Sequence, residues 1–76
     1  MKLTELINVL LPEADITFEI KEETRPTGLY AKEILEKYPH AKNYEVISIE
    51  PAIAYLEDNS EPTLMIEVSN GQEESQ

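Results

Sequence analysis

The sequence lacks most of the residue types on which enzyme active sites and metal centres are commonly built. It contains no cysteine, one histidine and two glycines, Gly28 and Gly71, among its 76 residues. The absence of cysteine excludes disulfides, thiol nucleophiles and cysteine-ligated metals, and two distant glycines cannot form a phosphate-binding loop. No motif places a nucleophile and an acid around His40, which is better explained as a favourable charge after the helix that Pro39 ends. We therefore expect a protein without enzymatic activity.

Basic residues are also scarce, because six lysines and arginines stand against sixteen acidic residues and leave a net charge of −10. This balance argues against direct binding of nucleic acids or anionic membranes, which both need a field of Lys and Arg. Residues 43–76 hold eight of the acids and no base, so most of the net charge lies there. Two interpretations stay open: a solvated surface that favours solubility, or an acidic face that docks on a basic partner.

Long hydrophobic runs are absent as well. The apolar stretch at residues 3–11 is interrupted by polar side chains and is too short to span a bilayer. It also lacks the basic start and the small-residue cleavage site of a signal peptide. We expect a cytoplasmic protein.

No metal or cofactor site is predicted. The one oxygen-rich cluster covers residues 57–61, and it lacks the alternating ligands and the central glycine of an EF-hand loop. The four tyrosines would stack on nucleic-acid bases only beside a basic groove. We expect them at the edge of the core instead.

Hydrophobic periodicity predicts two helices. Apolar residues recur at helical spacing over residues 3–11, and Pro12 disfavours helical geometry beyond them. A second helical stripe covers residues 30–38, with pairs of opposite charge four residues apart on its other side, and Pro39 ends it.

Alternating and β-branched residues predict the strands. They cover residues 16–21 and 63–69, a short strand over 29–31, and an extended segment over 44–56. Because a proline cannot donate to the ladder, we expect Pro51 at a sheet edge, at a bulge or at a break in the strand.

Together these elements predict a single α+β domain over residues 1–69. Its sheet is expected to have three to four antiparallel strands, with two short helices packed on one face, in the order α-β-(β)-α-β-β. Residues 70–76 have no apolar side chain and are expected to form a disordered acidic tail. The predicted core consists of Leu3, Leu6, Ile7, Leu10, Ile16, Phe18, Ile20, Ile34, Leu35, Tyr38, Ile47, Ile49, Leu64, Ile66 and Val68.

Five segments of the chain carry a resemblance to a known group of proteins. They are Lys-Leu-Thr-Glu-Leu-Ile, Leu-Leu-Pro-Glu-Ala-Asp-Ile-Thr-Phe-Glu-Ile, Gly-Leu-Tyr, Tyr-Glu-Val-Ile-Ser-Ile-Glu and Leu-Met-Ile-Glu-Val. In this order the chain resembles, over residues 2–68, small acidic uncharacterised proteins encoded by phages and prophages of Gram-positive bacteria. The resemblance implies a phage context and supports the order of elements, and it supplies no catalytic residue.

Two hypotheses about function follow. In the first, the chain is a non-enzymatic module that binds a protein, and its carboxylates stand in for phosphates to inhibit a basic host protein. Same-face residues of a strand lie about 6.6–6.8 Å apart, so carboxylates on neighbouring strands would form a phosphate-like array. The candidate partner-binding residues are Glu19, Glu50, Glu57, Asp58, Glu61, Met65 and Glu67.

In the second hypothesis, the chain is a structural or accessory module that forms a homodimer through its sheet. The face of the sheet expected to meet solvent is partly apolar, which is typical of a dimer surface. The apolar residues expected there are Val46, Ala52, Ala54, Leu56 and Met65.

Overall fold

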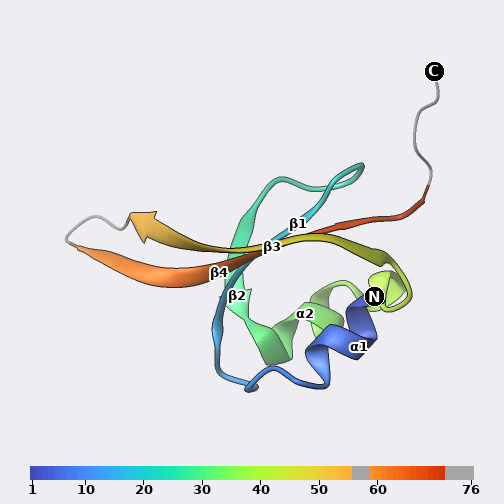
Figure 1. The fold of residues 1–76 in the computed structure, drawn as a ribbon, viewed down its shortest axis with the longest axis horizontal. Coiled ribbons are helices and arrows are strands. Elements are labelled where there is room, and N and C mark those ends of the chain that lie inside the picture. Colours follow the sequence, from blue (N-terminus) through green and yellow to red (C-terminus); the bar gives the residue numbers. More distant parts are fainter. Residues whose placement is uncertain (56–58, 72–76) are drawn as a thin grey trace.

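The computed structural model describes residues 1–55 and 59–71. Helices and strands follow one another in the predicted order (Figure 1). The α+β class, the four-stranded sheet and the two short helices are confirmed. Of the predicted tail, residues 72–76 lie outside the described residues.

The first helix, α1 (Leu3–Ile7), is shorter than the predicted span of residues 3–11. The Glu5 carboxylate accepts the backbone N–H three residues earlier at 2.8 Å, which satisfies a donor that the first helical turn leaves open. Beyond the helix the backbone continues in turns whose hydrogen bonds join residues three apart. Asn8 and the β-branched residue after it are weak helix formers, and Pro12 follows closely, so the prediction of a longer helix was wrong.

The second helix, α2 (Ala31–Lys37), agrees with the predicted span to within one residue at each end. The Glu33 carboxylate accepts the Tyr30 N–H at 2.9 Å at its start. Proline is compatible with the first position of a helical turn, and a short 3₁₀ helix, η1 (Pro39–Ala41), follows directly.

The sheet contains β1 (Asp15–Ile20), β2 (Thr27–Tyr30), β3 (Glu45–Tyr55) and β4 (Ser60–Ser69), in the spatial order β2-β1-β4-β3. Two pairs are antiparallel, but β1 and β4 run parallel, so the prediction of a wholly antiparallel sheet was wrong. The cause is the path of the chain. The segment with α2 carries the chain across one face from β2 at one edge to β3 at the other, and the final hairpin then returns β4 alongside β1 in the same direction.

The core lies between the helices and one face of the sheet. Ile16, Phe18 and Ile20 of β1 alternate inward, and the register places Leu64, Ile66 and Val68 of β4 directly beside them. Both helices add their apolar stripes from the same side, together with two small residues that the sequence did not single out. The buried apolar residues are Leu3, Leu6, Ile16, Phe18, Ile20, Ala31, Ile34, Ala41, Ile66 and Val68.

Strand β3 departs from the predicted core. The pairing with β4 shifts by one residue between Val46 and Ser48, which is a bulge, and such a shift exchanges the faces to which side chains point. As a result Val46 packs against the core. Ile47 lies at the bulge and is 45% exposed, and Ile49 keeps the core-side register opposite Ile66 but is 44% exposed on the edge strand, so the prediction that both are buried was wrong.

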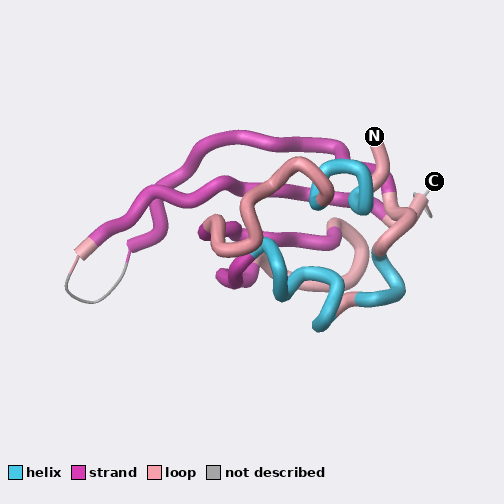
Figure 2. Tube along the Cα trace, turned by 90° about the horizontal axis from the view of Figure 1, so that it is seen from below, coloured by secondary structure: helices cyan, strands magenta, loops and turns pink. Residues whose placement is uncertain are grey.

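The hairpin of β3 and β4 extends past the rest of the sheet (Figure 2). Pairing of β4 with β1 begins only at Leu64, so the residues of β4 before it have β3 as their strand partner. Pro62 falls in this overhang, where its missing N–H removes no bond to β1. Pro51 lies in β3, an edge strand, as one of the predicted alternatives required. No helix reaches this far, since α1 packs against the start of β3.

Candidate binding face

The face of the sheet opposite the helices, which we call the open face, is covered by no described element. Alternation along each strand and the strand registers determine which residues share it. The open-face residues include Asp15, Thr17, Glu19, Gly28, Tyr30, Ser48, Glu50, Ala52, Ala54, Glu61, Thr63, Met65 and Glu67.

Three glutamates lie next to one another on this face. Glu19 of β1 is directly opposite Glu67 of β4, and Glu50 of β3 is the diagonal neighbour of Glu67 on the other side. Neighbouring strands are about 4.8 Å apart, so the three carboxylates cross three adjacent strands at close range. We call Glu19, Glu50 and Glu67 the carboxylate row.

The structure brings five of the seven candidate partner-binding residues onto the open face. Besides the carboxylate row these are Glu61, at the start of β4, and Met65, between Thr17 and Glu50. Glu57 and Asp58 lie outside the described residues.

Only part of the apolar surface expected for a homodimer lies on the open face. Ala52, Ala54 and Met65 lie on the open face and are half-buried. Val46 lies on the opposite face and contacts the core because of the bulge, so its assignment to the open face was wrong. Leu56 is outside the described residues.

None of the four strands in the described part of the chain contains a lysine or an arginine. The six bases all lie in the helices, the turns or the N-terminal segment. Over residues 1–55 and 59–71 the ion pairs join Glu23 to His40 and Glu45 to the N-terminal ammonium, and neither includes a member of the carboxylate row. The row is therefore an acidic surface without a cation of its own among the described residues.

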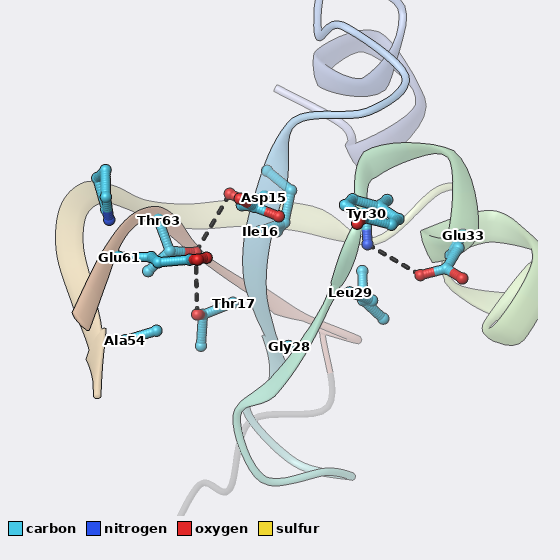
Figure 3. Close-up of a pocket in the computed structure, with 11 residues that line it drawn as sticks. Asp15, Ile16, Thr17, Gly28, Leu29, Tyr30, Glu33, Ala54, Glu61 and Thr63 are labelled. Carbon is cyan, nitrogen blue, oxygen red and sulfur yellow. Dashed lines mark hydrogen bonds between the residues drawn. The ribbon is translucent and has the colours of Figure 1, made fainter. Parts of the chain in front are cut away.

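A pocket of about 330 Å³ opens at the other end of the open face, where the β3–β4 hairpin passes the β1–β2 hairpin (Figure 3). Its lining includes the apolar residues Leu29, Ala54 and Pro62. Asp15, Tyr30 and Glu61 add polar groups. The Thr63 hydroxyl fixes the hairpin in place, because it donates to the Asp15 carbonyl at 3.2 Å and lies 3.2 Å from the Thr17 hydroxyl.

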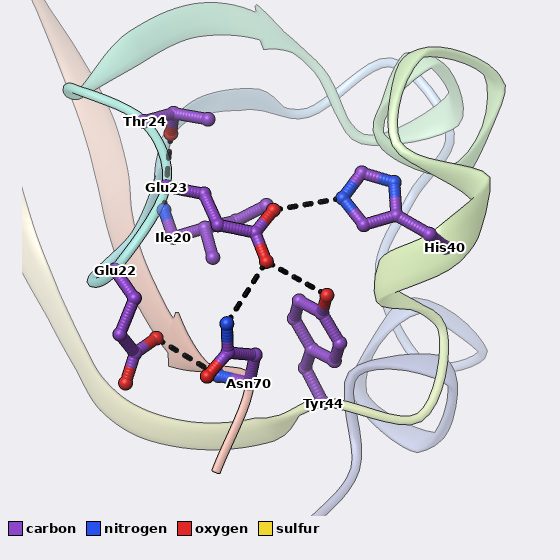
Figure 4. A network of polar contacts seen from close by, with 7 residues as sticks. All are labelled: Ile20, Glu22, Glu23, Thr24, His40, Tyr44 and Asn70. Atoms are coloured by element: carbon purple, nitrogen blue, oxygen red, sulfur yellow. Dashed lines mark hydrogen bonds and ion pairs between the residues drawn. The ribbon is translucent and has the colours of Figure 1, made fainter. Parts of the chain in front are cut away.

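A second polar cluster joins the turn after β1 to η1 and to the end of β4 (Figure 4). The Glu23 carboxylate accepts hydrogen bonds from His40 Nε2 at 2.9 Å, from the Tyr44 hydroxyl at 2.8 Å and from Asn70 Nδ2 at 3.1 Å. The neighbouring Glu22 accepts the Asn70 N–H at 2.9 Å and the Ser69 hydroxyl at 2.5 Å. These bonds tie together segments that are distant in the sequence.

The donors around this cluster shift the ionisation of its members. Hydrogen bonds from His40 and then Tyr44 lower the pKa of Glu23 from its ordinary value. The bond from Ser69 is the main cause of a lowered pKa at Glu22, and the bond to Glu23 raises the pKa of Tyr44. Since each carboxylate already has its donors in place and His40 is one of them, the cluster stabilises the fold.

No pattern in the sequence predicted this cluster. Its only local signals are two consecutive glutamates after a strand and a lone histidine after Pro39. The interpretation of His40 as a charge at a helix end missed its partner Glu23, because the partners come together only when the β1–β2 turn folds against η1.

The lowered pKa values predict how Glu23→Gln changes the pH dependence of stability. A carboxyl with a lowered folded-state pKa contributes stability above its unfolded pKa of about 4.3, and this contribution is lost as the pH falls through the folded-state value. We expect Glu23→Gln to be less stable than the wild type at pH 7 in urea unfolding, and the difference to shrink below about pH 4. Glu36→Gln, on the exposed side of α2, is the control and should show no such pH-dependent difference. A difference for Glu23→Gln that stays constant down to acid pH would contradict the ionic role of the cluster.

Within the described residues, no group of three or more His, Asp or Glu side chains is arranged to hold a metal ion. In the same part of the chain, none of the helices has both the length and the apolar character needed to cross a bilayer.

No protein-family model matches the chain, and no curated protein or solved structure is significantly similar to it. The resemblance to small phage proteins therefore stays a prediction.

Proposed function

We propose that this chain is a non-enzymatic protein-binding module whose open face docks on a basic surface of a partner protein. The observation that carries the proposal is the register that places Glu19 directly opposite Glu67, with Glu50 beside them. Like charges directly opposite each other on neighbouring strands destabilise a sheet. A partner that supplies cations would relieve this repulsion, so the arrangement favours the bound state.

The absence of bases from the strands supports the same function. An acidic face without its own lysines or arginines attracts a basic partner over a long range and accelerates the encounter. The bases of the chain lie outside the strands, so the net charge of −10 is distributed unevenly and the charged side chains of the sheet are all acidic.

The chemistry of the partner follows from the acids. The row's glutamates lie on adjacent strands, and neighbouring strands are about 4.8 Å apart. Their carboxylates present acceptors to the lysines and arginines that normally contact phosphates. In this proposal the protein occupies the nucleic-acid groove of a basic host protein in the cytoplasm and inhibits it. The resemblance to small acidic phage proteins supports such a role.

An oligo-arginine peptide is a suitable probe for the docking face, observed through the amide chemical shifts of the protein by NMR. We expect the largest shifts at the carboxylate row and at its open-face neighbours, and small shifts in α1 and α2. Binding should weaken strongly as the ionic strength rises from about 10 mM to about 150 mM, because the Debye length falls from about 30 Å to about 8 Å.

Two single variants separate the face from the net charge. Glu67→Gln and Glu36→Gln each remove one negative charge, the first from the carboxylate row and the second from α2. Glu67→Gln should weaken binding several-fold and Glu36→Gln should have little effect. Equal weakening by both variants would show that the peptide responds to net charge alone, and the docking face would be refuted.

Self-association is a second candidate, and strand β3 favours it. On this edge strand Ile53 and Tyr55 are 55% and 82% exposed, and Ile47 and Ile49 are nearly half exposed. An apolar edge strand is a template for pairing with a second copy. Light scattering at low and high salt distinguishes the candidates: a salt-insensitive dimer supports self-association, and a monomer that binds the basic peptide supports the docking face.

A further inference from the structure

We infer that the pocket between the two hairpins receives an arginine side chain of the basic partner. This inference rests on the proposed function and names the partner's contact residue. The pocket belongs to the open face, because Thr17, Ala54, Glu61 and Thr63 line it and lie on that face. A partner that covers the carboxylate row would therefore also cover the mouth of the pocket.

The wall of the pocket suits the stem of a long basic side chain. Leu29, Ala54 and Pro62 give the pocket an apolar side. Arginine and lysine bury their methylene groups along such surfaces and keep the charged end at a polar rim. A volume of about 330 Å³ accommodates one such side chain with water beside it.

The rim selects a guanidinium over an ammonium. The register places Tyr30 directly opposite Asp15, and its ring is nearly half exposed. Glu61 of β4 also lines the pocket. A planar guanidinium can donate to carboxylates through several N–H groups while it stacks on an aromatic ring, which a lysine ammonium does less well.

The charge around the pocket also favours a cation. A second hollow of about 550 Å³ adjoins the first and shares Asp15, Tyr30 and Glu61 with it. The residues that line the two hollows include four carboxylates, of Glu13, Asp15, Glu33 and Glu61, and one ammonium, of Lys32.

Gly28 gives an independent indication that the pocket is kept open. Its φ lies outside the left-handed region that favours glycine, and a Cβ built on it would meet no atom within 4 Å. Neither the backbone nor close packing therefore requires a glycine here, although glycine weakens a strand. What the missing side chain does leave is free space in the wall of the pocket.

The test uses two small probes, Nα-acetyl-arginine methylamide and its lysine counterpart, titrated into the protein by NMR. The arginine probe should shift the amides of Leu29, Tyr30 and Thr63 saturably, with a dissociation constant in the millimolar range. The lysine probe should bind several-fold more weakly. Gly28→Val fills the pocket and keeps the net charge at −10, so it should weaken the arginine probe at least tenfold.

Further variants keep the inference falsifiable if Gly28→Val fails to fold. Glu61→Gln should weaken the arginine probe several-fold, and Glu36→Gln, which lines neither hollow, should not. Wild-type affinity in Gly28→Val, or shifts confined to the carboxylate row, would overturn the pocket assignment and leave the docking face intact. If Glu67→Gln left the affinity for the oligo-arginine peptide unchanged while the arginine probe still shifted the amides of the pocket, the docking face alone would be refuted.

Discussion

Replacing Phe18 by alanine should remove a large share of the stability of the protein at 25 °C. The Phe18 side chain is fully buried in the central strand β1, beside Ile66 of β4, and its ring centroid lies 5.4 Å from that of Tyr38. Phe→Ala changes in a core remove about 3–5 kcal/mol from the free energy of unfolding. A domain of 76 residues has a free energy of unfolding of about 4–11 kcal/mol. The substitution therefore removes a large fraction of it.

Urea unfolding followed by circular dichroism measures the effect, and thermal unfolding should show a fall in Tm of roughly 12 °C or more. Ile53→Ala is the matched control, because it removes an apolar side chain from the same sheet at a position that is 55% exposed. Its effect should stay below about 1 kcal/mol. If the two variants lost the same stability, the core would not be centred on β1 and β4.

The parts of the fold that could be predicted are those set by local patterns. Alternation along 16–20 and 64–68 determined which side chains of β1 and β4 point inward, and Pro39 marked the end of α2. The parallel pairing of β1 with β4 depends on how the chain crosses the sheet, which no local pattern encodes. The bulge beside Val46 also has no local signal in the sequence, and it turned Val46 from the predicted open face to the core side.

The candidate face could be predicted only as a set of positions. Strand alternation was enough to assign Glu19 and Glu67 to the polar side of their strands, and the structure places both on the open face. That they lie directly opposite each other follows from the parallel register, which the sequence did not predict. The pocket and the cluster around Glu23 were missed because each joins segments far apart in the chain.

Reversal of the carboxylate row should abolish rapid docking on a basic partner. Glu19→Lys, Glu50→Lys and Glu67→Lys together remove three negative charges and add three positive ones, which takes the net charge from −10 to −4. Electrostatic steering raises association rates by about 10–10³-fold, and it depends on where the charges lie as well as on their sum. We expect the association rate with surface-immobilised oligo-arginine to fall at least about tenfold at about 10 mM ionic strength. The dissociation rate should change less, and the difference in association should narrow at about 150 mM, where screening is strong.

The control for this variant carries the same change in charge at other positions. Glu36→Lys, Glu73→Lys and Glu74→Lys also give a net charge of −4, but Glu36 lies on α2 and the other two follow the last strand in the sequence. If steering comes from the open face, the control should keep most of the wild-type association rate. Equal losses in the two triple variants would mean that total charge governs the encounter and that the row has no special part in it. A row variant that associates as fast as the wild type would leave the exposed apolar residues of β3 as the interaction surface, and self-association would then replace docking as the function to test.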